Sequence, residues 1–79
     1  MNIQELKNLL HEKNIPNELY NLDGIGRKDE RYCIELIGKE WVVYFTERGT
    51  RTTEEKFNTE EAACKYLIEQ LIDWHIEMA

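Results

Sequence analysis

An alternation with a period of two over residues 32–37 and 41–46, within the stretch from residue 31 to residue 57, constrains the fold of this chain more than any other feature. Such alternation is typical of β-strands, whose successive side chains point to opposite sides. Gly38 interrupts the pattern once, which predicts two antiparallel strands joined by a tight turn. The side chains on one side of this hairpin are all large and apolar: Tyr32, Ile34, Leu36, Trp41, Val43 and Phe45.

The residues that follow predict a second turn and a third strand. Residues 47–50 read Glu-Arg-Gly-Thr, with Gly49 placed to take the positive φ that a side chain disfavours. Residues 51–57 are rich in threonine and charge. Because charged side chains protect the unpaired edge of a sheet, we expect this segment to be an edge strand.

An amphipathic helix is predicted at each end of the sequence. Near the N-terminus, Asn2 and Glu5 have the spacing of a capping box, and Pro16 requires the helix to end before it. Near the C-terminus, we expect Asn58 to be the N-cap, with Glu61 completing a second capping box. The apolar residues that recur at helical spacing in this second helix are Cys64, Leu67, Ile68, Leu71 and Ile72.

Together these elements predict a single α+β domain over residues 1–79. Its order is α-β-β-β-α, with a small antiparallel sheet of three to four strands flanked by the N- and C-terminal helices. The fourth strand is a short one near Tyr20. A chain of 79 residues has room for one modest core and no separate cofactor domain.

The second side of the expected hairpin is unusually apolar for a solvated surface. If both helices lie on the first side, Ile37, Val42 and Tyr44 form an exposed patch suited to a partner or to a homodimer. Alternatively, one helix or the segment 17–28 covers these side chains.

The charge distribution favours a basic partner. The chain has a formal net charge of −6, and residues 54–79 hold seven acidic side chains and only two lysines. Such a field attracts cationic surfaces and speeds their encounter. The simpler alternative is that the charge only keeps a small protein soluble.

Residue types with catalytic or metal-binding chemistry are sparse. Cys33 and Cys64 lack a metal-binding spacing and are expected to be buried free thiols, and neither His11 nor His75 has a recognised ligand pattern around it. The glycines of residues 23–29 do not form a phosphate-binding signature. We therefore expect no catalysis, no cofactor and no metal.

The order of elements also occurs in double-stranded-RNA-binding domains, which need cations at the start of the last helix. This chain has acidic residues there, so we expect no nucleic-acid binding. Residues 1–5 lack the basic and apolar regions of a signal peptide, and no apolar run approaches the length of a membrane span. Cytoplasmic location without membrane association is the resulting expectation.

Four segments resemble a family of small bacterial proteins, the immunity proteins of polymorphic toxin systems. They are residues 20–22 (YNL), 30–35 (ERYCIE), 41–49 (WVVYFTERG) and 57–67 (FNTEEAACKYL). The resemblance implies a protein that binds a cognate toxin, often a nuclease, and blocks it without catalysis. It carries no functional residues over to this chain.

The sequence therefore predicts an immunity protein that occludes a basic toxin, and the alternative is a housekeeping interaction domain. In the first case we expect an acidic surface from the last helix and the 47–50 turn, with aromatic anchors. The candidate partner-binding residues are Tyr44, Glu47, Arg48, Glu60, Glu61, Glu69, Asp73 and Trp74.

Overall fold

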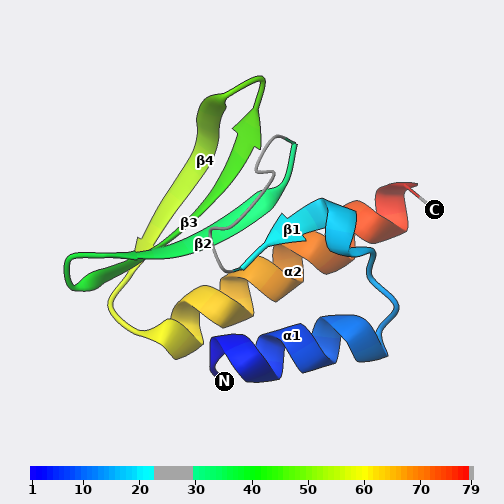
Figure 1. Ribbon diagram of the computed structural model, residues 1–79, viewed down its shortest axis with the longest axis horizontal. Helices are drawn as coiled ribbons and strands as arrows, with labels where there is room; N and C mark the ends of the chain where they lie inside the picture. The colour runs from blue at the N-terminus through cyan, green and yellow to red at the C-terminus, as the bar shows by residue number, and fades with distance from the viewer. Residues whose placement is uncertain (23–29, 79) are drawn as a thin grey trace.

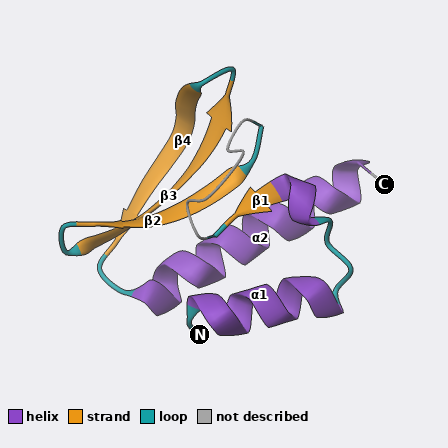
Figure 2. Ribbon diagram, in the orientation of Figure 1, coloured by secondary structure: helices purple, strands orange, loops and turns teal. Residues whose placement is uncertain are grey.

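The computed structural model describes residues 1–22 and 30–78, with described side chains ending at Asp73 in the last helix. The chain forms two α-helices, one 3₁₀ turn and a four-stranded sheet (Figures 1 and 2). The elements in chain order are α1 (Ile3–Glu12), η1 (Asn17–Leu19), β1 (Tyr20–Asn21), β2 (Tyr32–Ile37), β3 (Glu40–Glu47), β4 (Thr50–Phe57) and α2 (Glu60–Met78). The predicted α+β class and the order of helices and strands are confirmed.

The sheet has the strand order β1-β2-β3-β4. The two hairpin pairs, β2 with β3 and β3 with β4, are antiparallel as expected. The short strand predicted near Tyr20 is present, but β1 pairs with β2 in parallel, so the sheet is mixed rather than antiparallel. β4 lies at one edge, which agrees with its charged and threonine-rich sequence.

The boundaries of α1 follow from local hydrogen bonds. The Asn2 side chain accepts a bond from the Glu5 amide at 2.8 Å, and the Glu5 carboxylate accepts one from the Asn2 amide, which completes the predicted capping box. At the other end, Asn14 adopts a φ of 57° and the Ile15 amide donates to the Leu10 carbonyl at 3.0 Å. This is a Schellman motif with asparagine in the left-handed position.

The helices form layers on one side of the sheet. α2 packs against β2, β3 and β4, while α1 packs against α2 and runs in the same direction (Figure 1). The core between them is closed by side chains with almost no exposed surface. These include Leu6, Leu10, Ile34, Val43, Cys64, Leu67 and Leu71. This core uses the face of the β2–β3 hairpin that the alternation predicted.

The two hairpin turns explain two of the glycines. Gly38 has a φ of 64° at the first central position of the β2–β3 turn, where a type II′ turn favours glycine. In the β3–β4 turn, Arg48 and Gly49 have φ values of 52° and 79°. Positive φ at both central positions is the pattern of a type I′ turn, so Arg48 occupies a position that Asn or Gly fills more easily.

A β-bulge in β4 stands opposite Tyr44. Val43 pairs with Glu55 and Phe45 pairs with Thr52, so two residues of β4 oppose one residue of β3. Thr53, one of those two, has a φ of 48°, which is rare for a β-branched residue. The bulge shifts the side of the sheet on which the remaining residues of β4 lie.

Candidate protein-binding surface

The sheet face turned away from the helices is closed within the chain. Val42 and Tyr44 are only 2% and 1% exposed, and they form a second small cluster with buried Cys33. Of the two alternatives, the exposed patch of Ile37, Val42 and Tyr44 is therefore wrong, because only Ile37 reaches the surface, and the segment 17–28 that was named as a possible cover lies partly outside the described residues. Tyr44 cannot act as an exposed aromatic anchor, and the dimer surface expected there is reduced to one residue.

Polar side chains lie around Tyr44 on this face of the sheet. The Arg51 guanidinium lies 4.1 Å from the centre of the Tyr44 ring, and it pairs with the Glu35 carboxylate at 3.4 Å and that of Glu54 at 3.7 Å. Burial raises the pKa of the Tyr44 hydroxyl, and its hydrogen bond to Glu35 raises that pKa further. The β-bulge brings Arg51 and Glu54 to this face together. This cluster pairs the charge of Arg51 with the carboxylates of Glu35 and Glu54.

Glu47 and Arg48 lie in the β3–β4 turn, apart from the other candidate residues. Figure 1 shows this turn and the start of α2 at opposite ends of β4. Eight residues of extended strand span about 25 Å. Glu47 and Arg48 therefore lie far from Glu60 and Glu61 at the start of α2.

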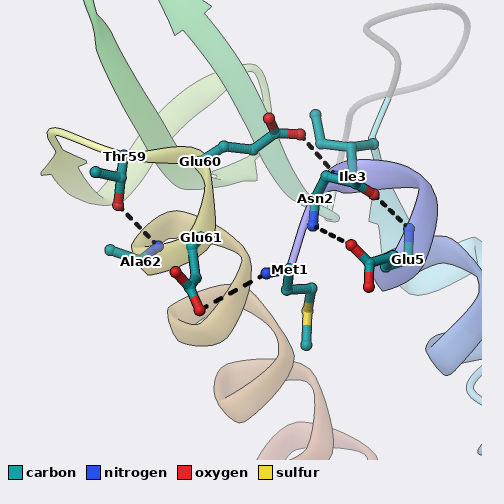
Figure 3. Close-up of polar contacts among 8 residues, drawn as sticks. All are labelled: Met1, Asn2, Ile3, Glu5, Thr59, Glu60, Glu61 and Ala62. Atoms are coloured by element: carbon teal, nitrogen blue, oxygen red, sulfur yellow. Dashed lines mark hydrogen bonds and ion pairs between the residues drawn. The ribbon is translucent and has the colours of Figure 1, made fainter.

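Glu60 and Glu61 lie where the first turns of α1 and α2 meet (Figure 3). The Glu60 carboxylate accepts a hydrogen bond from the Ile3 amide at 2.8 Å, so it caps the neighbouring helix. The Glu61 carboxylate lies 3.7 Å from the amino group of Met1 and stays 64% exposed. Because α1 and α2 run parallel, the positive ends of their two helix dipoles lie close together. The carboxylates of Glu60 and Glu61 offset that positive charge.

The N-cap of α2 is Thr59 and not Asn58 as predicted. The helix begins at Glu60, and the Thr59 hydroxyl accepts a hydrogen bond from the Ala62 amide at 3.1 Å (Figure 3). Threonine at this position satisfies one of the amides that lack a partner within the helix. The shift by one residue moves Glu61 out of the capping-box position and leaves it available to Met1.

A stripe of charged residues follows the outer surface of α2. Glu61, Lys65, Glu69 and Asp73 are all exposed and recur every four residues, which places them on one side of a helix. Three of these four carry negative charge, and all three were candidate partner-binding residues. We call this set the α2 acidic stripe. The side chain of Trp74, the remaining candidate, lies outside the described side chains.

One hollow and the placement of the metal-binding residue types bear on what the described part of the chain can bind. An open hollow of about 280 Å³ lies beyond the end of α1, lined by His11, Asn14, Ile15, Pro16, Asn17 and Tyr20. No three His, Cys, Asp or Glu side chains within the described ranges lie close enough to hold a metal ion.

Both cysteines are buried free thiols, as expected, and burial raises the pKa of Cys64 to about 11. Within the same part of the chain, no helix is long and apolar enough to cross a membrane. The glycine-containing segment 23–29 lies outside the described residues.

No family model matches the chain. Curated proteins and solved structures likewise give no significant match. The resemblance to immunity proteins therefore remains a hypothesis supported by the four segments alone.

Two exposed aliphatic residues at the end of the β2–β3 hairpin were not among the candidates. Leu36 is 55% exposed and Ile37 is 48% exposed. The alternation with a period of two predicted that Leu36 lies on the side of the sheet that the helices cover. Leu36 does lie on that side. However, the strand extends beyond the region that the helices cover. The exposure of Leu36 cannot be predicted from the alternation alone, because this exposure depends on where α2 begins to contact the sheet.

Proposed function

We propose that this protein is an immunity protein that binds and neutralises a cognate bacterial toxin without catalysis. The toxin presents a basic surface, and the α2 acidic stripe contributes the attraction. The stripe is the observation that carries the proposal: it presents three exposed carboxylates and one lysine along a single side of α2. Such a row is complementary to the cationic clefts with which nucleases hold phosphates.

The distribution of the remaining charge supports this choice of surface. Arg51 is engaged with two carboxylates on the outer face of the sheet, and Glu60 is engaged with the first turn of α1. The stripe residues Glu69 and Asp73 are exposed and lie on the same side of α2 as Glu61. Because an ion pair within the chain weakens the field at a surface, Glu69 and Asp73 are better sources of attraction than those clusters and than Glu61, which pairs with the amino group of Met1.

The direct test is binding to the purified product of the neighbouring gene, measured by titration calorimetry at low and moderate salt. The stripe variant Glu61→Gln/Glu69→Gln/Asp73→Asn removes three negative charges. Exposed charge pairs contribute about 0.2–1 kcal/mol each, so we expect affinity to fall roughly 3- to 100-fold at low salt. The loss should shrink as salt rises.

A matched control removes the same number of charges elsewhere. Glu12, Glu18 and Glu30 are exposed and lie outside α2. The variant Glu12→Gln/Glu18→Gln/Glu30→Gln has the same net charge as the stripe variant and should bind nearly as the unmodified protein does. Absence of binding by the unmodified protein at either salt concentration contradicts the proposed function. Equal losses in both triple variants would leave net charge, rather than the stripe, as the cause.

A further inference from the structure

A row of four apolar side chains crosses the helix-covered side of the sheet at the β2–β3 hairpin end. Register places Leu36 opposite Trp41 and Trp41 opposite Phe57, so these three side chains are neighbours on one side of three adjacent strands. The centroid of the Phe57 ring lies 5.2 Å from that of Tyr66 on α2. Leu36 is 55% exposed, and the three aromatic residues are partly exposed while they pack against the core. We call these four residues the apolar row.

The apolar row reaches the surface because the strands extend beyond the helices. β4 ends at Phe57 and α2 begins at Glu60, so α2 starts beside the row. Figure 1 shows the β2–β3 turn projecting past the start of α2. Ile37 is also 48% exposed, but it lies on the opposite side of the sheet from Leu36, because successive strand residues alternate. The row is therefore one continuous surface, and Ile37 is not part of it.

The charged side chains around the apolar row balance one another. Residues 36–41 and 55–59 hold two basic and two acidic residues, all of them exposed: Lys39, Glu40, Glu55 and Lys56. Around Tyr66, Lys65 and Glu69 also carry opposite charges. The chain as a whole has a net charge of −6, so two copies repel each other overall. The hairpin end is a surface at which they can meet without a local excess of like charge.

The size of the apolar row fits a weak symmetric dimer. A fully exposed aromatic side chain offers roughly 200 Å², so the partly exposed rings and Leu36 together present on the order of 200 Å² of apolar surface. Weak interfaces bury less than about 600 Å² on each partner, of which slightly more than half is apolar. The row supplies most of that apolar part. In a dimer with two-fold symmetry each copy contributes the same patch, so each row covers the other.

We propose that the apolar row is a self-association surface, through which two copies of this chain form a weak two-fold dimer. The inference does not depend on the proposed function, because the dimer requires no toxin. Burial of the row against a second copy provides the attraction, and the balanced charges around it limit the repulsion.

The test compares Leu36→Thr with the matched control Ile37→Thr. Both changes remove a half-exposed aliphatic side chain next to the same turn, introduce a residue suited to strands and keep the net charge, but only Leu36 belongs to the row. Sedimentation equilibrium over a roughly hundredfold range of concentration measures the dissociation constant of the dimer. We expect Leu36→Thr to raise this constant about tenfold or more, because each dimer loses two leucines, and Ile37→Thr to change it less than about threefold.

Two further measurements use the unmodified protein. In NMR spectra recorded on dilution, the amide signals of Leu36, Trp41 and Phe57 should shift more than those of Cys33 and Tyr44, which lie on the other side of the sheet. Added salt screens the repulsion between two chains of net charge −6, so it should lower the dissociation constant of the dimer. Binding to a basic toxin should weaken under the same change.

The outcomes separate this inference from the proposed function. A protein that stays monomeric over the whole concentration range overturns the dimer and leaves the proposed function standing. A dimer that both variants weaken equally, or neither weakens, places the interface outside the apolar row, so the inference is wrong. A dimer that dissociates as salt rises is held by ionic contacts, which contradicts the charge argument. Failure of the toxin-binding measurement bears only on the proposed function.

Discussion

Replacement of Glu60 by alanine should destabilise the protein far more than the same change at Glu61. Both residues lie in the first turn of α2 and carry the same charge, yet their environments differ. The Glu60 carboxylate accepts the Ile3 amide at 2.8 Å in a partly buried site. The Glu61 carboxylate is 64% exposed and pairs with the Met1 amino group at 3.7 Å. The pair of variants therefore separates a partly buried charged hydrogen bond from an exposed ion pair.

The expected magnitudes follow from these contacts. A hydrogen bond to a charged group contributes about 1.5–3 kcal/mol, and Glu60→Ala also leaves the Ile3 amide without its acceptor. We therefore expect the free energy of unfolding to fall by about 2 kcal/mol. In a domain of this size, that corresponds to a melting temperature roughly 8–16 °C lower. For Glu61→Ala, the loss of an exposed pair predicts a change of about 0.5 kcal/mol or less.

Urea unfolding followed by circular dichroism measures both variants, and Glu60→Gln serves as the intermediate case. The amide oxygen of glutamine can still accept from Ile3 but has no charge to offset the two helix dipoles. We expect its loss of stability to be about half that of Glu60→Ala. Equal effects of Glu60→Ala and Glu61→Ala would refute the role assigned to the Glu60–Ile3 bond. So would a Glu60→Ala variant as stable as the unmodified protein.

Three further predictions concern local geometry and pH. Asn14→Ala should cost about 1 kcal/mol because alanine resists the positive φ at the end of α1, whereas Asn14→Gly should be neutral or stabilising; urea unfolding distinguishes the two. Arg48→Asn should raise the melting temperature by about 2–4 °C, because asparagine suits a type I′ turn, and an unchanged or lower value would contradict the turn assignment. Because burial raises the pKa of Cys64, the folded state holds the thiol proton more tightly than the unfolded state does. The resulting contribution to the free energy of unfolding is complete below pH 9 and is lost as pH rises toward about 11. Relative to Cys64→Ala, the unmodified protein should lose roughly 2–3 kcal/mol across that interval, and parallel stability profiles for the two proteins would exclude this effect.

The features that were predicted correctly mostly have a local cause, although the equally local capping box predicted at Asn58 and Glu61 was wrong because Thr59 caps α2. The capping box of α1 joins Asn2 and Glu5, which are three residues apart, and both of its hydrogen bonds form in the structure. The hairpin strands follow from a period of two, and Gly49 follows from the backbone conformation of a tight turn. Each of these patterns is complete within a few residues, so it depends little on distant contacts.

Tertiary structure decided which candidate residues are available to a partner. Tyr44 and Leu36 both belong to strands that were predicted correctly, yet Tyr44 is buried beneath Arg51 while Leu36 extends past the helices into solvent. Glu60 looks like part of an acidic surface in the sequence, but it caps α1 because the two helices run in parallel. Exposure and hydrogen-bond partners of this kind depend on segments up to 57 residues apart, and the spacing of neighbouring residues holds no information about how such segments approach one another.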